Sequence, residues 1–521
     1  MDGSSTASDP RDAGNYPSPQ RNATSTCHLS PRPTRILFVT TEFGDFVKVG
    51  GLGDVSSALP RALARWCDVR VLVPGYRQLL ARCGNLEIVG HCRAFAALPA
   101  CDIGKLRTPD GLTVYVLLCP ELYDRDGTPY GDAQNGDWPD NDVRFARLSL
   151  AATELAGGQV DGEWAADVLH VNDWPAALAP AYACWRGHQV PTILTIHNLA
   201  YQGIFSRDSL DRIGAPDHAF QIDGIEFYDR LSFLKAGIVY ASQVTTVSET
   251  YAREILDPAF GCGLDGLLRK RAAENRLSGI LNGIDENWDP RTCTHLAKQF
   301  EAGDWKGKQA NAESIRRDFG LAASRGPLFS VVARLVHQKG IDLVLSVADS
   351  IVSAGGQIVV MGTGERQLEI ATQTLARRHA KHVAVKIGFD EAESRRILAG
   401  SDFMLTPSRF EPCGLSQMCA QRVGTLPIGH KTGGLAETID DGQTGFLFAE
   451  PSVNGLFGAL CRGFSTFSSK RRLYQMRSQA MSRKFDWDRS AIKYQQLYRN
   501  CADHKQGATA VVSAGNVAAA S

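Results

Sequence analysis

A lysine and a run of glycines stand where a phosphate could bind. The stretch Lys48-Val49-Gly50-Gly51-Leu52-Gly53-Asp54 follows a short β-like run at residues 36–40 and precedes apolar residues with helical spacing. Glycines let the backbone approach a ligand closely, and the first N–H groups of a helix carry a partial positive charge. The pattern therefore predicts a strand, a glycine-rich turn and a helix start that together hold an anion, with Lys48 adding a full charge.

Two other interpretations of this stretch remain open. Gly51-x-Gly53-x-x-Ser56 differs from the dinucleotide-binding fingerprint by a serine in place of the third glycine. The next β-like run ends in Pro74-Gly75 and not in the acidic residue that the fingerprint requires, which disfavours an NAD-dependent oxidoreductase. The turn could also be rich in glycine for structural reasons alone.

More polar clusters follow predicted strands elsewhere in the chain. They lie at residues 170–174, 197–203, 334–340, 407–415 and 432–434. Arg334 and Lys339 can neutralise a diphosphate, because arginine offers a planar fork of donors and lysine a compact charge. Gly414 and Leu415, where a turn leads into a helix, offer backbone N–H groups to the same anion.

Two side chains have the chemistry of acid–base work or charge stabilisation. Glu411 is a carboxylate that could bind sugar hydroxyls or face a developing positive charge, and His197 can donate or accept a hydrogen bond near neutral pH. No Asp-x-Asp follows a strand as in a metal–diphosphate site, and the nearest such run, Asp140-Asn141-Asp142, precedes a helix-like segment. We therefore expect neither a metal nor a cofactor, with basic side chains and backbone amides in their place.

The composition is that of an ordinary globular protein. Its 521 residues suggest more than one domain, and a formal net charge of zero points neither to nucleic acid nor to an anionic membrane. No apolar run reaches the length of a membrane span, and the N-terminus lacks the apolar core of a secretory signal. The 13 cysteines are scattered without a CxxC pair, so we expect reduced thiols in a cytoplasmic protein.

Alternating β-rich and helical runs must position the polar clusters. The strand candidates are residues 36–40, 69–73, 114–119, 168–171, 192–196 and 243–247, followed by 328–333, 357–361, 384–387, 403–406 and 426–429. This alternation predicts an α/β fold with two Rossmann-like, doubly wound domains. Because ligands bind at the carboxyl ends of parallel strands, we expect the two domains to face each other with the active site in the cleft between them.

Composition also divides the chain into five segments. We expect a disordered N-terminal extension at residues 1–33, an N-terminal Rossmann-like domain at 34–285, a C-terminal Rossmann-like domain at 286–480, a helix at 481–500 that packs back on the first domain, and a disordered tail at 501–521.

Taken together, these motifs resemble those of the bacterial glycogen synthases in the glycogen/starch synthase family of retaining glycosyltransferases. The resemblance extends from about Arg35 to about Arg499. It rests on residues 48–52, 140–145, 195–203, 281–285, 334–340, 407–415 and 432–438. Two positions depart from the family pattern: Asn172 stands where the family usually has a second histidine, and Gln417-Met418-Cys419 replaces Gln-Leu-Tyr.

The resemblance implies transfer of glucose, with retention of configuration, from ADP-glucose to the non-reducing 4-hydroxyl of an α-1,4-glucan such as glycogen. It implies catalytic roles for Asp173, His197 and Glu411. It implies donor binding by Lys48, Gly50, Gly51, Tyr130, Asn282, Arg334, Lys339, Cys413, Gly414 and Leu415.

Two further functions stay open on the residues alone. One is a transferase that makes another α-glucoside from the same donor, and the other is a non-catalytic glucan-binding protein that retains the fold. The joint presence of Lys48, Arg334, Lys339 and Glu411 argues against the second, because a decayed site would be expected to lose its charged groups first.

Overall fold

Two β-sheets organise the part of the chain that the structure describes. The computed structural model describes residues 32–132 and 136–518, with side chains only as far as Asp503. The disorder that the sequence predicts for residues 1–33 therefore concerns a segment that lies, apart from Arg32 and Pro33, outside the described residues. No described helix is both long enough and apolar enough to cross a membrane.

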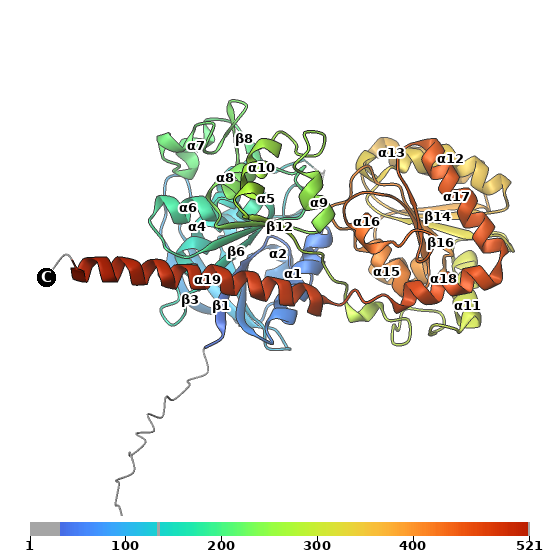
Figure 1. Cartoon of the computed structure of the whole chain (residues 1–521), viewed down its shortest axis with the longest axis horizontal. Helices are drawn as coiled ribbons and strands as arrows, with labels where there is room; N and C mark the ends of the chain where they lie inside the picture. Colours follow the sequence, from blue (N-terminus) through green and yellow to red (C-terminus); the bar gives the residue numbers. More distant parts are fainter. Residues whose placement is uncertain (1–31, 133–135, 519–521) are drawn as a thin grey trace, which may run out of the picture. The chain divides into compact units, whose positions relative to one another are not determined.

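The first sheet has nine strands in the described residues, in the order β12-β11-β7-β6-β1-β2-β5-β4-β3. Figure 1 labels β12, β6, β1 and β3 of this sheet. They are β1 (Thr34–Val39), β2 (Cys67–Pro74), β3 (Glu87–Cys92), β4 (Cys101–Arg107), β5 (Thr113–Leu118), β6 (Val168–Asn172), β7 (Thr192–Ile196), β11 (Gln243–Thr246) and β12 (Leu277–Gly279). All pairs from β12 to β5 are parallel, as predicted.

The edge beyond β5 corrects the prediction of a wholly parallel sheet. β5 pairs with β4, and β4 with β3, in antiparallel register. Neither β3 nor β4 was predicted, because both are interrupted by glycine and carry polar residues that stay accessible at the sheet edge. Buried parallel strands instead form the continuous apolar runs that the sequence reveals most clearly.

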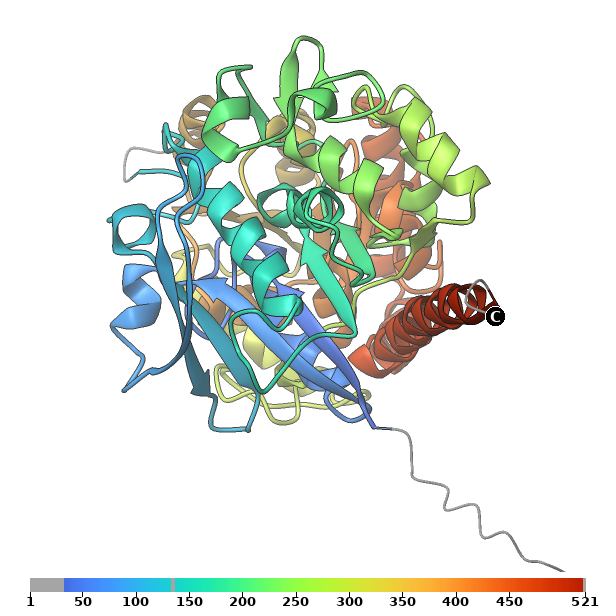
Figure 2. The ribbon, with the colours of Figure 1, turned by 90° about the vertical axis from the view of Figure 1, so that its left-hand side faces the viewer.

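Helices cover both faces of the first sheet (Figure 2). They include α1 (Gly51–Leu63), α4 (Asn141–Ala156), α5 (Asp173–Ala176), α6 (Ala179–Trp185), α8 (Phe233–Tyr240), α9 (Glu249–Glu254) and α10 (Asp265–Ala273). Short elements line the loops: α2 (Arg77–Leu80), α3 (Pro120–Tyr123), α7 (Ser209–Ile213), β8 (Ile204–Phe205), β9 (Glu226–Phe227) and β10 (Arg230–Ser232). The strands β8, β10 and β9 form a small antiparallel sheet of their own.

The second sheet is entirely parallel in the order β15-β14-β13-β16-β17-β18. Its strands are β13 (Leu328–Val332), β14 (Gln357–Gly362), β15 (Val383–Ile387), β16 (Phe403–Thr406), β17 (Leu426–His430) and β18 (Phe446–Phe448). Its helices are α11 (Trp305–Asp318), α12 (Ile341–Ser353), α13 (Arg366–Arg378), α14 (Glu391–Gly400), α15 (Ser416–Arg422), α16 (Gly433–Thr438), α17 (Val453–Ser468) and α18 (Lys470–Ser482).

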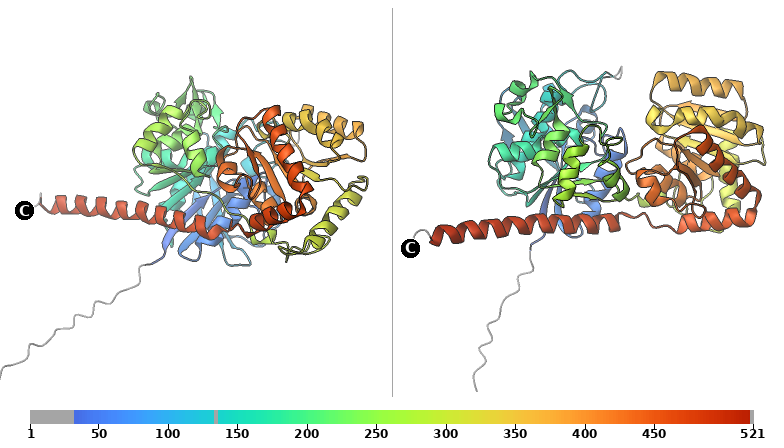
Figure 3. Two further views of the ribbon diagram at one scale, coloured as in Figure 1. Left: turned by 45° about the vertical axis from the view of Figure 1, so that its right-hand side comes forward. Right: turned by 45° about the horizontal axis from the view of Figure 1, so that its top comes forward.

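Alternation along β13 shows how this sheet is buried on both faces. Phe329 and Val331 join a core that includes α12 and α17, whereas Leu328 and Val332 join the core that includes α14 and α15. Successive side chains of a strand point to opposite faces. Figure 3 shows the helices layered on the two sides of this sheet. These observations confirm the expected α/β class with two doubly wound sheets.

The helix α19 (Trp487–Ala518) follows α18 and packs against β1, β6 and α1 of the first sheet (Figures 1 and 3). Trp487, Ala491, Tyr494 and Tyr498 are buried in the first sheet's core. This helix corrects the prediction of a disordered tail at residues 501–521. The backbone stays helical from Cys501 to Ala518, and residues 519–521 lie outside the described residues. A packed helix supplies the costly nucleus, and the alanine-rich, proline-free continuation propagates it.

Candidate functional site

The glycine-rich turn lies at the start of α1, where the sequence predicted it. Gly50 is the N-cap residue, and no side chain caps the helix. The carboxylate of Glu42, which follows β1, accepts hydrogen bonds from the N–H groups of Val49 and Gly50, both at 2.8 Å. The turn therefore binds an anion, which in this structure is an internal carboxylate. Glu42 was not among the predicted site residues, because its position just beyond β1 is its only signal in the sequence.

Tyr130 supports this carboxylate from the other side. Its hydroxyl donates to Glu42 Oε1 at 2.7 Å and lies 3.1 Å from the Thr41 hydroxyl. Burial raises the pKa of Tyr130 well above its usual value, so the phenol keeps its proton. The predicted donor-binding tyrosine is thus joined to the glycine-rich turn through Glu42.

Lys48 forms ion pairs with a helix of the first sheet and with a helix of the second. Its ammonium lies 2.6 Å from Asp54 in α1 and 3.3 Å from Glu391, the first residue of α14. Burial lowers the pKa of Lys48, but the two carboxylates outweigh burial and the net shift is upward. Lys48 therefore stays charged at neutral pH.

Asp173 opens α5 immediately after β6, with a positive φ of 55°. Its Oδ1 accepts hydrogen bonds from the backbone N–H groups of His197 at 2.7 Å and Asn198 at 3.4 Å. Burial raises the pKa of Asp173 to about 7, although the two N–H groups oppose this shift and the nearby Glu42 adds to it. The structure thus brings Asp173 and the His197 loop together.

Asn172, which departs from the family pattern, orients His197. The Asn172 amide nitrogen donates to the Val39 carbonyl at 3.0 Å, which turns its oxygen toward His197 Nε2 at 2.9 Å. His197 Nε2 must then carry the proton, which leaves Nδ1 as an acceptor. Burial lowers the pKa of His197 to about 3, so the ring is neutral. The asparagine therefore fixes one tautomer of a neutral histidine.

In the loops of the second sheet, Lys339 and Glu411 form an ion pair with each other. The Ser408 hydroxyl also donates to Glu411, at 2.9 Å. Gly340 brings the two loops together: its φ is +67°, and a Cβ there would lie 2.2 Å from the Pro407 carbonyl oxygen. Only glycine permits this approach. A cation and a carboxylate are thus held side by side at the carboxyl ends of β13 and β16.

Arg334 contacts the loop that carries His197. Its guanidinium donates to the Tyr201 hydroxyl at 2.8 Å and lies 5.8 Å from the centre of the Tyr201 ring. Residues from the second sheet and from the first therefore meet at this point, as they do where Ser248 donates to the Pro412 carbonyl at 2.5 Å.

Asn282, Cys413, Gly414 and Leu415 lie together between these loops. Burial raises the pKa of the Cys413 thiol to about 12, against an opposing effect of hydrogen bonds from Asn282. The Asn282 side-chain oxygen is buried without a hydrogen-bond partner among the described residues. A Cβ on Gly51 would touch Leu415 at 3.5 Å, so the glycine-rich turn approaches the start of α15.

Glu254 makes another contact between the two sides that was not predicted from the sequence. The Glu254 carboxylate in α9 accepts from the Gly433 N–H at 2.9 Å and from the Thr432 hydroxyl at 3.0 Å, at the start of α16. A single sequence gives no signal for a partner 179 residues away. Here, as at Val49 and Gly50, an internal carboxylate engages amides that suit an anion.

The arrangement collects the predicted site residues into one region with two sides. Lys48, Gly50, Gly51, Tyr130, Asp173 and His197 belong to the first sheet's loops, and Arg334, Lys339, Glu411, Cys413, Gly414 and Leu415 to the second's. An ion pair between Lys48 and Glu391 and a hydrogen bond from Arg334 to Tyr201 join the two sides. Among the described residues, no group of three or more His, Cys, Asp or Glu side chains could hold a metal ion.

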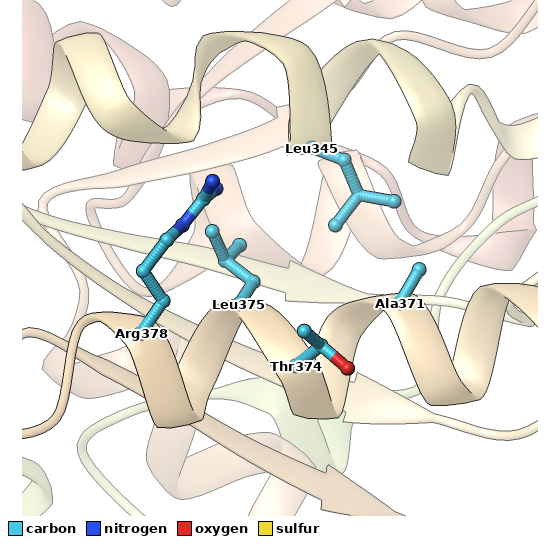
Figure 4. Close-up of a pocket in the computed structure, with 5 residues that line it drawn as sticks. All are labelled: Leu345, Ala371, Thr374, Leu375 and Arg378. Carbon is cyan, nitrogen blue, oxygen red and sulfur yellow. The ribbon is translucent and has the colours of Figure 1, made fainter.

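A surface hollow elsewhere does not share this chemistry. It has a volume of about 330 Å³ and lies between α12 and α13 (Figure 4). Its lining is Leu345, Ala371, Thr374, Leu375 and Arg378. It contains no carboxylate and none of the predicted site residues, so it offers no alternative reaction centre.

The raised pKa of Asp173 predicts a pH-dependent stability. A carboxyl whose folded-state pKa is about 7, against an ordinary value of 3.8, costs stability as the pH rises from 3.8 through 7, because the unfolded chain ionises first. Asp173→Asn should therefore raise Tm by a few degrees at pH 8 and leave it unchanged at pH 4. Asparagine keeps the acceptor oxygen and tolerates positive φ. Equal Tm differences at both pH values would contradict a buried, protonatable Asp173.

Comparison with known proteins adds two family matches. A model described as the starch synthase catalytic domain matches residues 35–270, and one described as glycosyl transferases group 1 matches residues 313–461. The first covers the loops that carry Lys48, Asp173 and His197, and the second those that carry Arg334, Lys339 and Glu411.

Relatives extend over nearly the whole chain. Glycogen synthase 1 of Bradyrhizobium diazoefficiens is 62% identical over 458 residues, which cover 88% of this chain and 99% of that protein. A glycogen synthase of Pseudomonas fluorescens is 55% identical over 469 residues, which cover 90% of each.

The chain is also similar to solved structures over 90% of its length. The catalytic domain of starch synthase IV from Arabidopsis thaliana, bound to ADP and acarbose, has a TM-score of 0.81 at 31% identity and covers 90% of this chain and 99% of that one. A sucrose-phosphate synthase from Thermosynechococcus elongatus, with a TM-score of 0.57 at 17% identity, covers 90% of this chain and 98% of that one and shares the fold alone.

Proposed function

This chain belongs to the family of bacterial glycogen synthases and starch synthases, and we propose how its side chains perform that family's reaction. The protein is a retaining glucosyltransferase that uses ADP-glucose. Glucose passes to the non-reducing 4-hydroxyl of an α-1,4-glucan, for which we propose glycogen. The observation that carries our assignment of roles is the ion pair of Lys339 and Glu411 at the strand ends of the second sheet, where Arg334 also follows β13.

The second sheet supplies the groups that hold the donor. Arg334 and Lys339 bind the diphosphate, and the amides of Gly414 and Leu415 at the start of α15 point to the same anion. Lys48, with Gly50 and Gly51, closes the site from the first sheet. Tyr130, Asn282 and Cys413 line the donor side, and the lone buried oxygen of Asn282 offers an acceptor to a sugar or ribose hydroxyl.

The bond from glucose C1 to the diphosphate breaks, and ADP leaves with its electron pair. Positive charge develops on the sugar ring and negative charge on the leaving group. Fixed cations aimed at the leaving group stabilise this state more than the ground state. Glu411 stabilises the positive ring, and Asp173 and His197 orient the glucose. The acceptor 4-hydroxyl forms the new bond to C1 and gives up its proton to a phosphate oxygen of the departing ADP.

Donor consumption with and without glycogen tests this function. Release of ADP from ADP-glucose should depend on added glycogen, and the glucan should grow by size analysis. Rapid release of ADP that does not lengthen glycogen would favour a transferase that makes another glucoside. Binding of glycogen without any release of ADP would favour a non-catalytic glucan-binding protein.

The reaction is expected to need no added metal. Arg334, Lys339 and backbone amides place positive charge where other diphosphate sites place a cation, so activity should survive exhaustive chelation. The measurement is the initial rate before and after treatment with EDTA, followed by dialysis. Loss of activity that magnesium or manganese restores would contradict this assignment of the basic groups.

We also propose that the enzyme acts in the cytoplasm. All twelve cysteines among the described residues are free thiols, and several are buried. Free thiols in this number suit a reducing compartment. Fractionation of the source cells, with detection of the protein, tests this location.

A further inference from the structure

A two-residue hairpin loop carries a tyrosine in an unusual backbone conformation. Phe227 of β9 pairs with Arg230 of β10, and between them Tyr228 and Asp229 have φ values of +52° and +59°. Two positive φ angles identify the type I′ geometry, which favours Asn-Gly or Asp-Gly because the Cβ of a bulky residue is strained there. A tyrosine at the first position therefore needs a reason other than the turn itself.

Core packing does not supply this reason. Tyr228 is 77% exposed, and Ile222 on the neighbouring loop is 81% exposed. The Tyr228 ring makes an edge contact with Phe227 and presents the remainder to solvent. A strained backbone conformation persists only where neighbouring contacts hold it in place, and residues with such strain cluster at sites that bind ligands.

The surroundings do hold this loop rigidly. Lys235 in α8 is only 8% exposed, and its ammonium donates to the carbonyls of Ile222, at 2.6 Å, and Glu226. Glu226 Oε1 in turn accepts from the Asp229 N–H at 2.7 Å. A buried cation and a carboxylate thus fix the backbone on both sides of the exposed tyrosine.

The hairpin is built directly on the loop that carries His197. Gln202 donates to the Cys262 carbonyl at 2.9 Å, and a Cβ on the next residue, Gly263, would lie 3.4 Å from the Tyr228 ring. The N–H of Phe233, the first residue of α8 directly after β10, also donates to the Gly203 carbonyl at 3.0 Å. The tyrosine is therefore tied, through two neighbouring backbones, to the site.

We propose that Tyr228 is a stacking platform for a glucose residue of the acceptor glucan, outside the reaction centre. This inference rests on the proposed function, because it assigns a polymeric acceptor to a surface beside that site. The apolar C–H face of a pyranose ring covers an aromatic face, while its hydroxyl groups reach polar neighbours at the edge. Tyr228 offers such a face.

The surroundings of the ring favour a sugar chain over a protein partner. Gln221, Asp223, Asp229 and Arg230 are all exposed around Tyr228 and Ile222. These side chains can exchange hydrogen bonds with hydroxyl groups. Protein interfaces instead need a contiguous patch with an apolar centre and few charged groups in it.

The substitution Tyr228→Asn separates stacking from structure. Asparagine tolerates positive φ, so the variant should fold and its Tm should equal or exceed that of the wild type. The KM for glycogen should rise about fivefold, with kcat and the KM for ADP-glucose unchanged, because one exposed stacking contact is lost. Tyr228→Phe should keep the wild-type KM for glycogen. Phe457→Ala, which removes an exposed aromatic ring from α17, is the matched control and should change neither KM.

Direct binding distinguishes failure of this inference from failure of the proposed function. Calorimetry with maltoheptaose should show about fivefold weaker binding to Tyr228→Asn than to the wild type, whether or not the protein transfers glucose. Equal affinities, or an equal loss in Phe457→Ala, would overturn the stacking role. A fall in kcat or a rise in the KM for ADP-glucose would overturn it as well, because Tyr228 would then serve the donor side. A wild type that binds maltoheptaose but never releases ADP would instead refute the proposed function.

Discussion

Lys339→Ala is expected to lower the rate of glucose transfer by roughly a hundredfold or more in a protein that still folds. Loss of one charge-assisted contact to a developing anion costs on the order of 2–4 kcal/mol of transition-state stabilisation. In this structure Lys339 pairs with Glu411, so the substitution also leaves that carboxylate with the Ser408 hydroxyl as its remaining side-chain partner. The KM for ADP-glucose should rise together with the fall in kcat, because in the role we propose the ammonium contacts the diphosphate in both the ground state and the transition state.

A surface lysine of the same sheet provides the matched control. Lys386 in β15 pairs with Glu393 and is 45% exposed, so Lys386→Ala should leave both kcat and KM near their wild-type values. Circular dichroism and Tm establish that both variants fold. Near-normal turnover of a folded Lys339→Ala protein would refute its role in holding the diphosphate.

Glu411→Gln is expected to lower kcat by about a hundredfold while changing the KM for ADP-glucose little. Glutamine keeps the size of the side chain and an acceptor for the Ser408 hydroxyl, but it removes the negative charge that, in the role we propose, faces the positive sugar ring. An interaction realised mainly in the transition state affects kcat and not binding. Stopped-flow or steady-state kinetics over a range of ADP-glucose concentrations separates the two parameters.

Two comparisons make the Glu411 prediction specific. Glu365→Gln is the control, because Glu365 caps the nearby His337 N–H at 3.0 Å on an exposed surface and should tolerate the change. The double variant Lys339→Ala/Glu411→Gln should lose less activity than the two single losses multiplied, because the partners touch. A Glu411→Gln variant that raises KM and keeps kcat would show that this carboxylate serves binding alone.

The strands that could be predicted are those buried on both sides. β7 and β16 have the predicted bounds because their apolar runs are continuous and end in polar clusters. β3 and β4 escaped prediction because the glycines and accessible polar side chains of an antiparallel edge give no such signal. The helix beyond Cys501 was also missed, since an alanine-rich tail can be either disordered or helical until it is joined to a packed helix.

The types of residue at the site could be predicted, but their internal partners could not. Lys339 and Glu411 each stand in a recognisable motif, yet nothing in either motif indicates that they pair. Glu254 engages the amide of Gly433 across 179 residues of chain, which only tertiary structure brings together, whereas Glu42 engages the amide of Gly50 from eight residues away.

The orientation of His197 depends on Asn172, which stands where the family usually has a second histidine. Asn172 could be recognised as an exception to the family pattern, but its effect follows from two hydrogen bonds, one to Val39 and one to His197. These bonds fix the tautomer through the amide, which has one donor end and one acceptor end. A histidine at position 172 could fix the tautomer of His197 only in one of its own protonation states.

Nuclear magnetic resonance of the product is the measurement that tests the central claim most directly. ADP-glucose labelled with ¹³C at glucose C1 is incubated with the enzyme and glycogen, and the anomeric signal of the product is followed with time. We predict that the label appears only in α-1,4-linked residues, in step with release of ADP. A β-linked signal, label in free glucose or in a small glucoside, or no transfer by the folded enzyme would contradict a retaining ADP-glucose-dependent glucan synthase.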